Sequence, residues 1–156
     1  MNKDRSLLQR AVKLACSGIK EGGGPFGAVI TKSGKIIAEA NNRVVLSHDP
    51  TAHAEVLAIR KASEVLKSHD LSGCVIYASC EPCPMCLGAI YWSGIRKVVY
   101  SSDRSDAAAS GFNDSMIYNE IKLAPSKRKI AFIHRPDTGG EEAFRQWAQF
   151  EGKITY

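Results

Sequence analysis

Three cysteines stand close together in the sequence Cys80-Glu-Pro-Cys83-Pro-Met-Cys86. Cys83 and Cys86 are three positions apart at the start of an expected helix, so their sulfur atoms lie on one face of it. The start of a helix presents free N–H groups and the positive end of the helix dipole, which lower the pKa of a thiol and favour the thiolate. Because the thiolate is the form that binds zinc, Cys83 and Cys86 are predicted to be metal ligands.

His53 is the expected third ligand, in the sequence Thr51-Ala-His53-Ala-Glu55 at the start of another expected helix. Helix starts that follow parallel strands gather at one edge of a sheet, so His53 can meet the two cysteines although it is distant in sequence. Three protein ligands leave a tetrahedral zinc ion one open position for water, and the pKa of that water falls to about 7. We therefore expect one Zn²⁺ per chain, at a catalytic site.

Glu55 is predicted to be the general acid/base of that site. Positions i and i+2 of a helix point to different sides, so Glu55 is poorly placed as a second ligand beside His53. A carboxyl group near the open position can instead carry protons.

Other interpretations of the cysteines need different partners. An iron–sulfur site would require a fourth cysteine followed by proline soon after Cys86, and residues 87–93 contain none. A closed, structural zinc site could recruit Cys80 as its fourth ligand. A redox-active pair is a further reading of Cys83 and Cys86.

The elements that must position these residues alternate between helix and strand. The hairpin would turn at Ser33-Gly34. Periodicity and punctuation predict helices at 5–18, 52–67, 82–92, 114–121 and 141–150, and strands at 26–31, 35–39, 74–78, 96–100 and 129–133. This order predicts one α/β domain over residues 1–156, with a mostly parallel sheet covered on both faces.

Composition excludes several classes of protein. The 156 residues are 44% hydrophobic and 24% charged, which is typical of a globular domain. No apolar run is long enough to span a membrane, and the first residues do not form a signal peptide, so a cytoplasmic protein without a membrane partner is expected. The net charge is +5, with a basic stretch from Lys122 to Arg135. We interpret that stretch as a solvated edge and expect no nucleic-acid partner.

The motifs His53-Ala-Glu55 and Pro82-Cys83-Pro-Met-Cys86 resemble the signature of zinc-dependent nucleobase deaminases, in the cytidine/deoxycytidylate deaminase-like family. Bacterial tRNA adenosine deaminases share them. Further segments resemble bacterial guanine deaminases in particular: residues 24–28, residues 79–86, Gly111-Phe-Asn-Asp114, and a tail with Phe144, Trp147 and Tyr156.

The resemblance implies a three-layer α/β/α sandwich with a five-stranded mixed sheet, and the hydrolytic deamination of guanine to xanthine and ammonia. It also implies that Asn42 hydrogen-bonds the base, that Ala54 contributes its main-chain N–H, and that Phe26 and Trp92 wall the pocket. Asp114 would face the amine that leaves and help to protonate it. Plain core packing is the alternative for the two aromatic residues, and an ordinary loop asparagine is the alternative for Asn42.

The end of the chain is expected to exchange between subunits. Phe144, Trp147 and Phe150 recur every three residues and form an apolar stripe on the last helix. The resemblance implies a homodimer in which residues 141–156 are swapped and Tyr156 caps the base bound by the partner. A helix packed on its own sheet is the alternative.

Three other functions stay open at this point. The same chemistry could act on guanosine or on a tRNA adenosine, and a zinc module without activity would need no carboxyl group such as Glu55 beside its metal.

Overall fold

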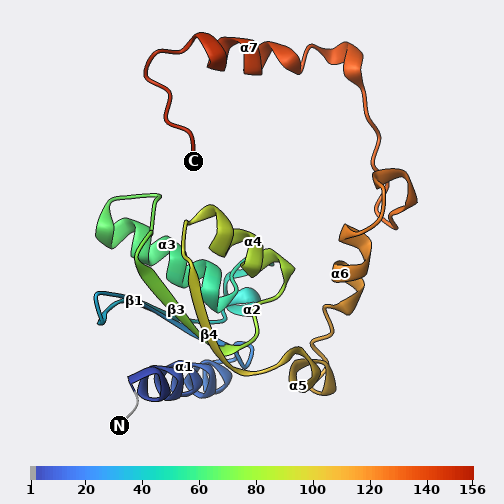
Figure 1. Ribbon diagram of the computed structural model, residues 1–156. Helices are drawn as coiled ribbons and strands as arrows, with labels where there is room; N and C mark the ends of the chain where they lie inside the picture. Colours follow the sequence, from blue (N-terminus) through green and yellow to red (C-terminus); the bar gives the residue numbers. More distant parts are fainter. Residues whose placement is uncertain (1–2) are drawn as a thin grey trace. The chain divides into compact units, whose positions relative to one another are not determined.

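The computed structural model describes residues 3–156, and the chain divides into two compact units, one ending at Asp114 and one running from Ser115 to Tyr156. The first unit contains a four-stranded sheet with the strand order β2-β1-β3-β4 (Figure 1). Its strands are β1 (Gly27–Lys32), β2 (Lys35–Asn41), β3 (Cys74–Cys80) and β4 (Lys97–Ser102).

The sheet is mixed. Strand β1 pairs antiparallel with both β2 and β3, and only β3 and β4 run parallel. The prediction of a mostly parallel sheet is therefore wrong. The hairpin makes β1 and β2 antiparallel, and β3 pairs with β1 while running in the opposite direction. The hairpin itself is confirmed: Ser33 and Gly34 between β1 and β2 have φ of 49° and 76°, the left-handed values that a tight hairpin turn requires.

Helices cover both faces of this sheet (Figure 1). On one face lies α1 (Lys3–Lys20), where Leu7 and Ala11 pack against Val29 and Tyr77 of the strands. The other face carries α3 (Ala54–Leu66) and α4 (Pro84–Trp92). The expected three layers are present in this unit.

Small residues let α3 approach the sheet closely. Ala54, Ala58 and Ala62 are fully buried at its inner face and belong to the same core as Ile30 and Ile76 of the strands. The start of α3, with the predicted histidine as its N-cap and the predicted glutamate in its first turn, is therefore fixed relative to the sheet.

The predicted fifth strand does not form. Residues 129–133 pair with no strand in the described chain, and Ile130 is 74% exposed. The main chain at Lys129 donates instead to the Glu120 carboxylate at 2.6 Å. Alternating apolar residues give a strand only where an edge accepts their main-chain hydrogen bonds, and the five-stranded sheet is corrected to four.

Two short helices of the first unit were not predicted from the sequence, namely α2 (Val44–Ser47) and α5 (Arg104–Ala109). The second unit contains α6 (Ser115–Ile121), the 3₁₀ turns Pro125–Lys127 and Pro136–Thr138, and α7 (Glu141–Gln149). None of its described residues is buried. Within the described chain, no helix combines the length and apolarity that crossing a membrane requires.

Candidate metal centre and active site

The three predicted ligands lie at the starts of two neighbouring helices. His53 is the N-cap of α3 and Cys83 is the N-cap of α4, both with extended main-chain angles. Cys86 is the third residue of α4 and is fully buried. Because an N-cap residue stands just outside the helix, its side chain can turn across the helix end toward a neighbour.

The distances among these side chains fit a tetrahedral zinc ion. The Nδ1 atom of His53 lies 3.6 Å from Sγ of Cys83 and 3.5 Å from Sγ of Cys86, and the two sulfur atoms are 3.6 Å apart. Tetrahedral geometry with ordinary zinc–ligand bonds requires about 3.6 Å between nitrogen and sulfur and about 3.8 Å between two sulfurs. The three residues are therefore already arranged as a donor set for zinc.

The electrostatics of the cysteine pair also suit a cation. Hydrogen bonds with Cys86 and with His53 together lower the pKa of the Cys83 thiol to about 4, although burial opposes the shift. The hydrogen bond between the two thiols, together with burial, raises the pKa of Cys86. The hydrogen bond between His53 and Cys83 raises the pKa of His53. The lowered pKa favours a thiolate at Cys83, and a dication bound there would favour loss of the proton from Cys86 as well.

Glu55 is the second residue of α3 and is buried, with 6% of its surface exposed. Burial raises the pKa of its carboxyl group, which also hydrogen-bonds the Cys86 thiol. A carboxyl group whose pKa is raised by burial is suited to accept a proton and to release it again.

Cys80 does not join this group. Its Sγ atom donates to the main-chain oxygen of Asp103 at 3.4 Å, and burial raises its pKa to about 11. Among the described residues, the cluster of possible ligands consists of His53, Cys83 and Cys86. The cluster thus offers three possible ligands, the number that a catalytic zinc site uses, and not the four of a closed site.

Two of the predicted substrate-binding residues, Ala54 and Asn42, lie on segments that are connected to the one that carries His53. Ala54 is fully buried and begins α3, directly after His53. Asn42 is buried and follows β2, and the neighbouring Arg43 donates its main-chain N–H to the oxygen of Ala52 at 3.0 Å. The loop that carries Asn42 is thereby tied to the segment that carries His53.

Phe26 packs its ring against the edge of Phe112, with 5.0 Å between ring centres. Asp114 follows two residues after Phe112, and burial raises the pKa of its carboxyl group while the nearby Arg104 opposes that shift. Sequence reasoning assigned no role to Phe112 or to Arg104. Arg104 forms an ion pair with Glu81 at 3.5 Å, which no sequence signal could reveal because the two residues lie on separate elements.

The remaining two candidates are exposed in the single chain. Trp92, at the end of α4, is 67% exposed, and Tyr156, in the second unit, is 80% exposed. Their predicted roles in substrate binding stay predictions.

Comparison with known proteins agrees with this site. Residues 1–102 match the family model for the cytidine and deoxycytidylate deaminase zinc-binding region. Guanine deaminase from Bacillus subtilis (strain 168) is 53% identical over 152 residues, which are 97% of each chain. A tRNA-specific adenosine deaminase from Aquifex aeolicus (strain VF5) is 44% identical over 96 residues, 62% of this chain and 64% of that protein.

The similarity extends to three-dimensional structure. The X-ray structure of guanine deaminase from Bacillus subtilis superposes with a TM-score of 0.96 at 52% identity, covering 100% of this chain and 99% of that one. The adenosine deaminase aligns only over a portion of the chain, whereas the guanine deaminase aligns over both units.

Proposed function

Because the chain belongs to the cytidine and deoxycytidylate deaminase family, we propose that it is a guanine deaminase, a hydrolase that converts guanine to xanthine and ammonia. One observation carries this function: the similarity to a guanine deaminase includes the metal cluster and continues to the end of the chain. The substrate is accordingly a small purine.

The proposed cofactor is one Zn²⁺ held by His53, Cys83 and Cys86, and its support is the tetrahedral spacing of the three donor atoms. When bound, the ion supplies an acidified water molecule as the nucleophile for the carbon that carries the amine. The protein must therefore orient guanine, move protons and exclude bulk water.

Glu55 is proposed to move the first proton. Its buried carboxylate takes a proton from the water and gives it to N3 of the purine, so that the ring can accept the electrons of the new bond. A raised pKa favours this shuttle, because the carboxyl group holds the proton long enough to pass it on.

The other proposed roles belong to residues around the same cluster. The main-chain N–H of Ala54, at the start of α3, stabilises charge that develops on the ring. Asp114 supplies a proton to the amine as ammonia leaves, and Asn42 hydrogen-bonds the base. Phe26 and Trp92 would wall the pocket.

An assay of ammonia release tests this function on guanine, guanosine, adenine, cytosine and a tRNA. Turnover of guanine far above the others is expected. Preferred turnover of guanosine would show that the site has room at N9. Preferred turnover of tRNA, with affinity falling steeply as salt rises because phosphate counterions are released, would assign the second candidate function.

We also propose that the protein is a homodimer with an exchanged C-terminal segment. In the second unit the apolar side chains of α7 are exposed, Phe144 at 78% and Phe150 at 56%, and Trp147 packs against Phe150 with 6.1 Å between ring centres. Large exposed apolar patches are typical of surfaces that bind another chain. By the resemblance, a second copy supplies the cover and Tyr156 closes the partner's pocket.

A further inference from the structure

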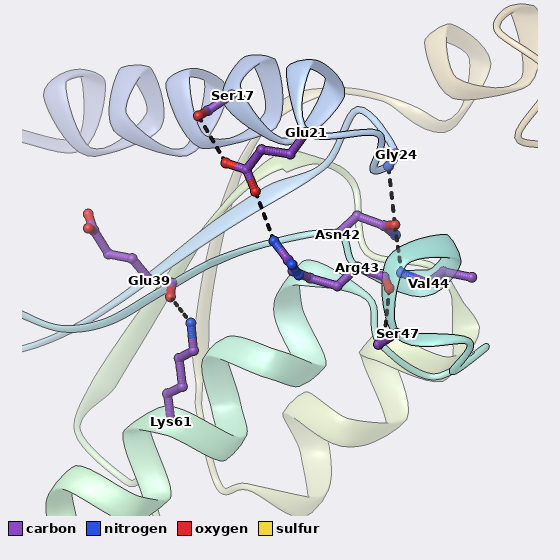
Figure 2. Close-up of polar contacts among 9 residues, drawn as sticks. All are labelled: Ser17, Glu21, Gly24, Glu39, Asn42, Arg43, Val44, Ser47 and Lys61. Atoms are coloured by element: carbon purple, nitrogen blue, oxygen red, sulfur yellow. Dashed lines mark hydrogen bonds and ion pairs between the residues drawn. The ribbon is translucent and has the colours of Figure 1, made fainter.

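The Asn42 side chain is held by two main-chain donors. Its Oδ1 atom accepts hydrogen bonds from the N–H of Gly24 at 3.3 Å and from the N–H of Val44 at 3.2 Å (Figure 2). Both partners are donors, so the atom between them must be the carbonyl oxygen of the carboxamide. This fixes which end of the amide faces the protein.

The NH₂ group of Asn42 is therefore the end that is left over. The residue is 6% exposed, and within residues 3–156 its nitrogen has no hydrogen-bond partner. The described chain nevertheless contains no enclosed side-chain nitrogen or oxygen without a partner. The NH₂ group must then reach open space, and a buried amide with two unused donors at such a position is a group built to meet an acceptor.

An ion pair beside Asn42 connects the same two segments through side chains. The Nη1 atom of Arg43 lies 2.8 Å from Oε2 of Glu21, which follows α1, and Ser17 donates to the other Glu21 oxygen at 3.5 Å (Figure 2). On the Arg43 side of the ion pair, the Ser47 hydroxyl donates to the main-chain oxygen of Arg43 at 2.6 Å. The pair thus joins residues 21–24 to residues 42–44, the segments that supply the donors to Asn42.

The fit between these segments is close. A Cβ atom added at Gly23 would lie 2.4 Å from the main-chain oxygen of Asn42, and one added at Gly24 would lie 3.1 Å from its Oδ1 atom. A small displacement of either segment would therefore change the direction of the Asn42 amide.

We propose that Glu21 and Arg43 are positioning residues: their ion pair fixes the direction of the Asn42 amide, to which the proposed function already assigns contact with the base, and leaves its NH₂ group as the end that can meet an acceptor of that base. The inference rests on the proposed function and deepens it. Guanine offers a carbonyl oxygen and ring nitrogens as acceptors. A base with an amino group at the same edge would place its N–H donors against the N–H donors of Asn42 and would be rejected. Selection of the base then depends on which end of the Asn42 amide faces it, and on residues 21–24 and 42–44, which hold that orientation.

The variant Asn42→Asp tests the polarity. The introduced side chain has the same size and can still accept both main-chain N–H bonds, so a purely structural role tolerates it. The proposal instead expects the KM for guanine to rise at least about ten-fold, with zinc content and thermal stability close to those of the wild type. A folded, zinc-loaded variant with the wild-type KM would overturn the proposal.

Charge exchange tests the positioning pair. Glu21→Arg and Arg43→Glu each place like charges together, and each should raise the KM for guanine about three- to ten-fold with a smaller change in kcat. The double variant restores an ion pair and should recover most of the affinity. Recovery in the double variant distinguishes positioning from a general loss of folding, because a damaged fold would worsen with a second substitution.

A second ion pair gives the matched control. Arg10 and Glu39 lie 2.7 Å apart and join α1 to β2 without contacting Asn42. Arg10→Glu should leave the KM for guanine unchanged. Equal effects of the control and of the Glu21 variant, or single variants with the wild-type KM, would overturn the role of the pair. A wild-type protein without guanine turnover would instead remove the proposed function.

Discussion

Cys80 and Cys83 are three residues apart, but their surroundings shift the pKa values of their thiols in opposite directions. The Cys83 thiol has a pKa lowered to about 4, and its sulfur lies 3.6 Å from Nδ1 of His53. Burial instead raises the pKa of Cys80 to about 11, and the Cys80 thiol donates a hydrogen bond to the main-chain oxygen of Asp103. We expect Cys83→Ala to lose bound zinc and Cys80→Ala to keep about one zinc per chain, by metal analysis of the purified proteins. Zinc retained in the first variant and lost from the second would reverse the ligand assignment.

A substitution of Glu55 should abolish nearly all turnover without affecting zinc binding. Glu55→Gln keeps the size of the side chain and removes the proton shuttle, so we expect zinc content and folding to persist while kcat falls by about two to four orders of magnitude. Ammonia release and metal analysis on the same sample measure both. Substantial turnover in the zinc-loaded variant would eliminate Glu55 as the general acid/base.

Asp114 should give a pH-dependent contribution. Burial raises the pKa of its carboxyl group, so the proton is held to a higher pH than on an exposed aspartate. A step that needs this proton slows as the pH rises through the raised pKa. Asp114→Asn should lower kcat at least about ten-fold, keep zinc, and lose this dependence on pH in a pH profile of kcat. Unchanged kinetic constants would place Asp114 outside the site.

The proximity of His53, Cys83 and Cys86 was predictable from sequence because each stands at or near a helix start, a position that local patterns mark well. Pro82 and the spacing of Cys83 and Cys86 predicted one helix start, which the structure places at Pro84, and His53 follows the signals of another. The polar contacts around Asn42 were not predictable. They join segments that are far apart in sequence, and the pattern contains no information on which charged side chains meet.

At the scale of elements, the sequence predicted most helices and the hairpin, but not the relative directions of the strands in the sheet. Apolar periodicity reports which face of an element is buried, and both parallel and antiparallel neighbours satisfy it. The same limit explains the strand expected at 129–133, where the alternation exists but no strand edge in the described chain accepts it.

Gly27 shows how closely α1 must approach β1. A Cβ atom added there would lie 2.2 Å from the main-chain oxygen of Ala11 and 2.7 Å from the nitrogen of Ala15. We expect Gly27→Ala to lower the free energy of unfolding by about 1–3 kcal/mol, because the helix must move away from the sheet. Denaturant titration of the purified protein measures the loss.

Gly88 provides the control for that substitution. It lies inside α4, and an added Cβ atom meets nothing within 4 Å. Gly88→Ala should raise the free energy of unfolding by about 0.5–1 kcal/mol, because alanine loses less main-chain freedom in a helix. Equal losses in both variants would show that the short distances at Gly27 are not what limits the packing.

At the scale of the whole molecule, the second unit poses a different energetic problem from the first. The first unit buries its apolar side chains on both faces of the sheet. The second unit exposes apolar residues throughout, including Met116, Ile121, Ile133 and Trp147. A segment of this kind gains stability only when another surface covers it.

The last residues should therefore matter more for catalysis than for folding. By the proposed exchange, residues 153–156 reach the site of the partner, where Tyr156 covers the bound base. Deleting them leaves α7 and its apolar stripe intact, so we expect a zinc-loaded dimer with sharply reduced guanine turnover. Light scattering reports the dimer and ammonia release reports the turnover. Tyr156→Phe is the matched variant: it keeps the ring and should retain more activity than the deletion, because a cap needs the aromatic surface. A wild-type monomer in solution, or a truncated protein with normal turnover, would contradict both the exchange and the covering role of the tail.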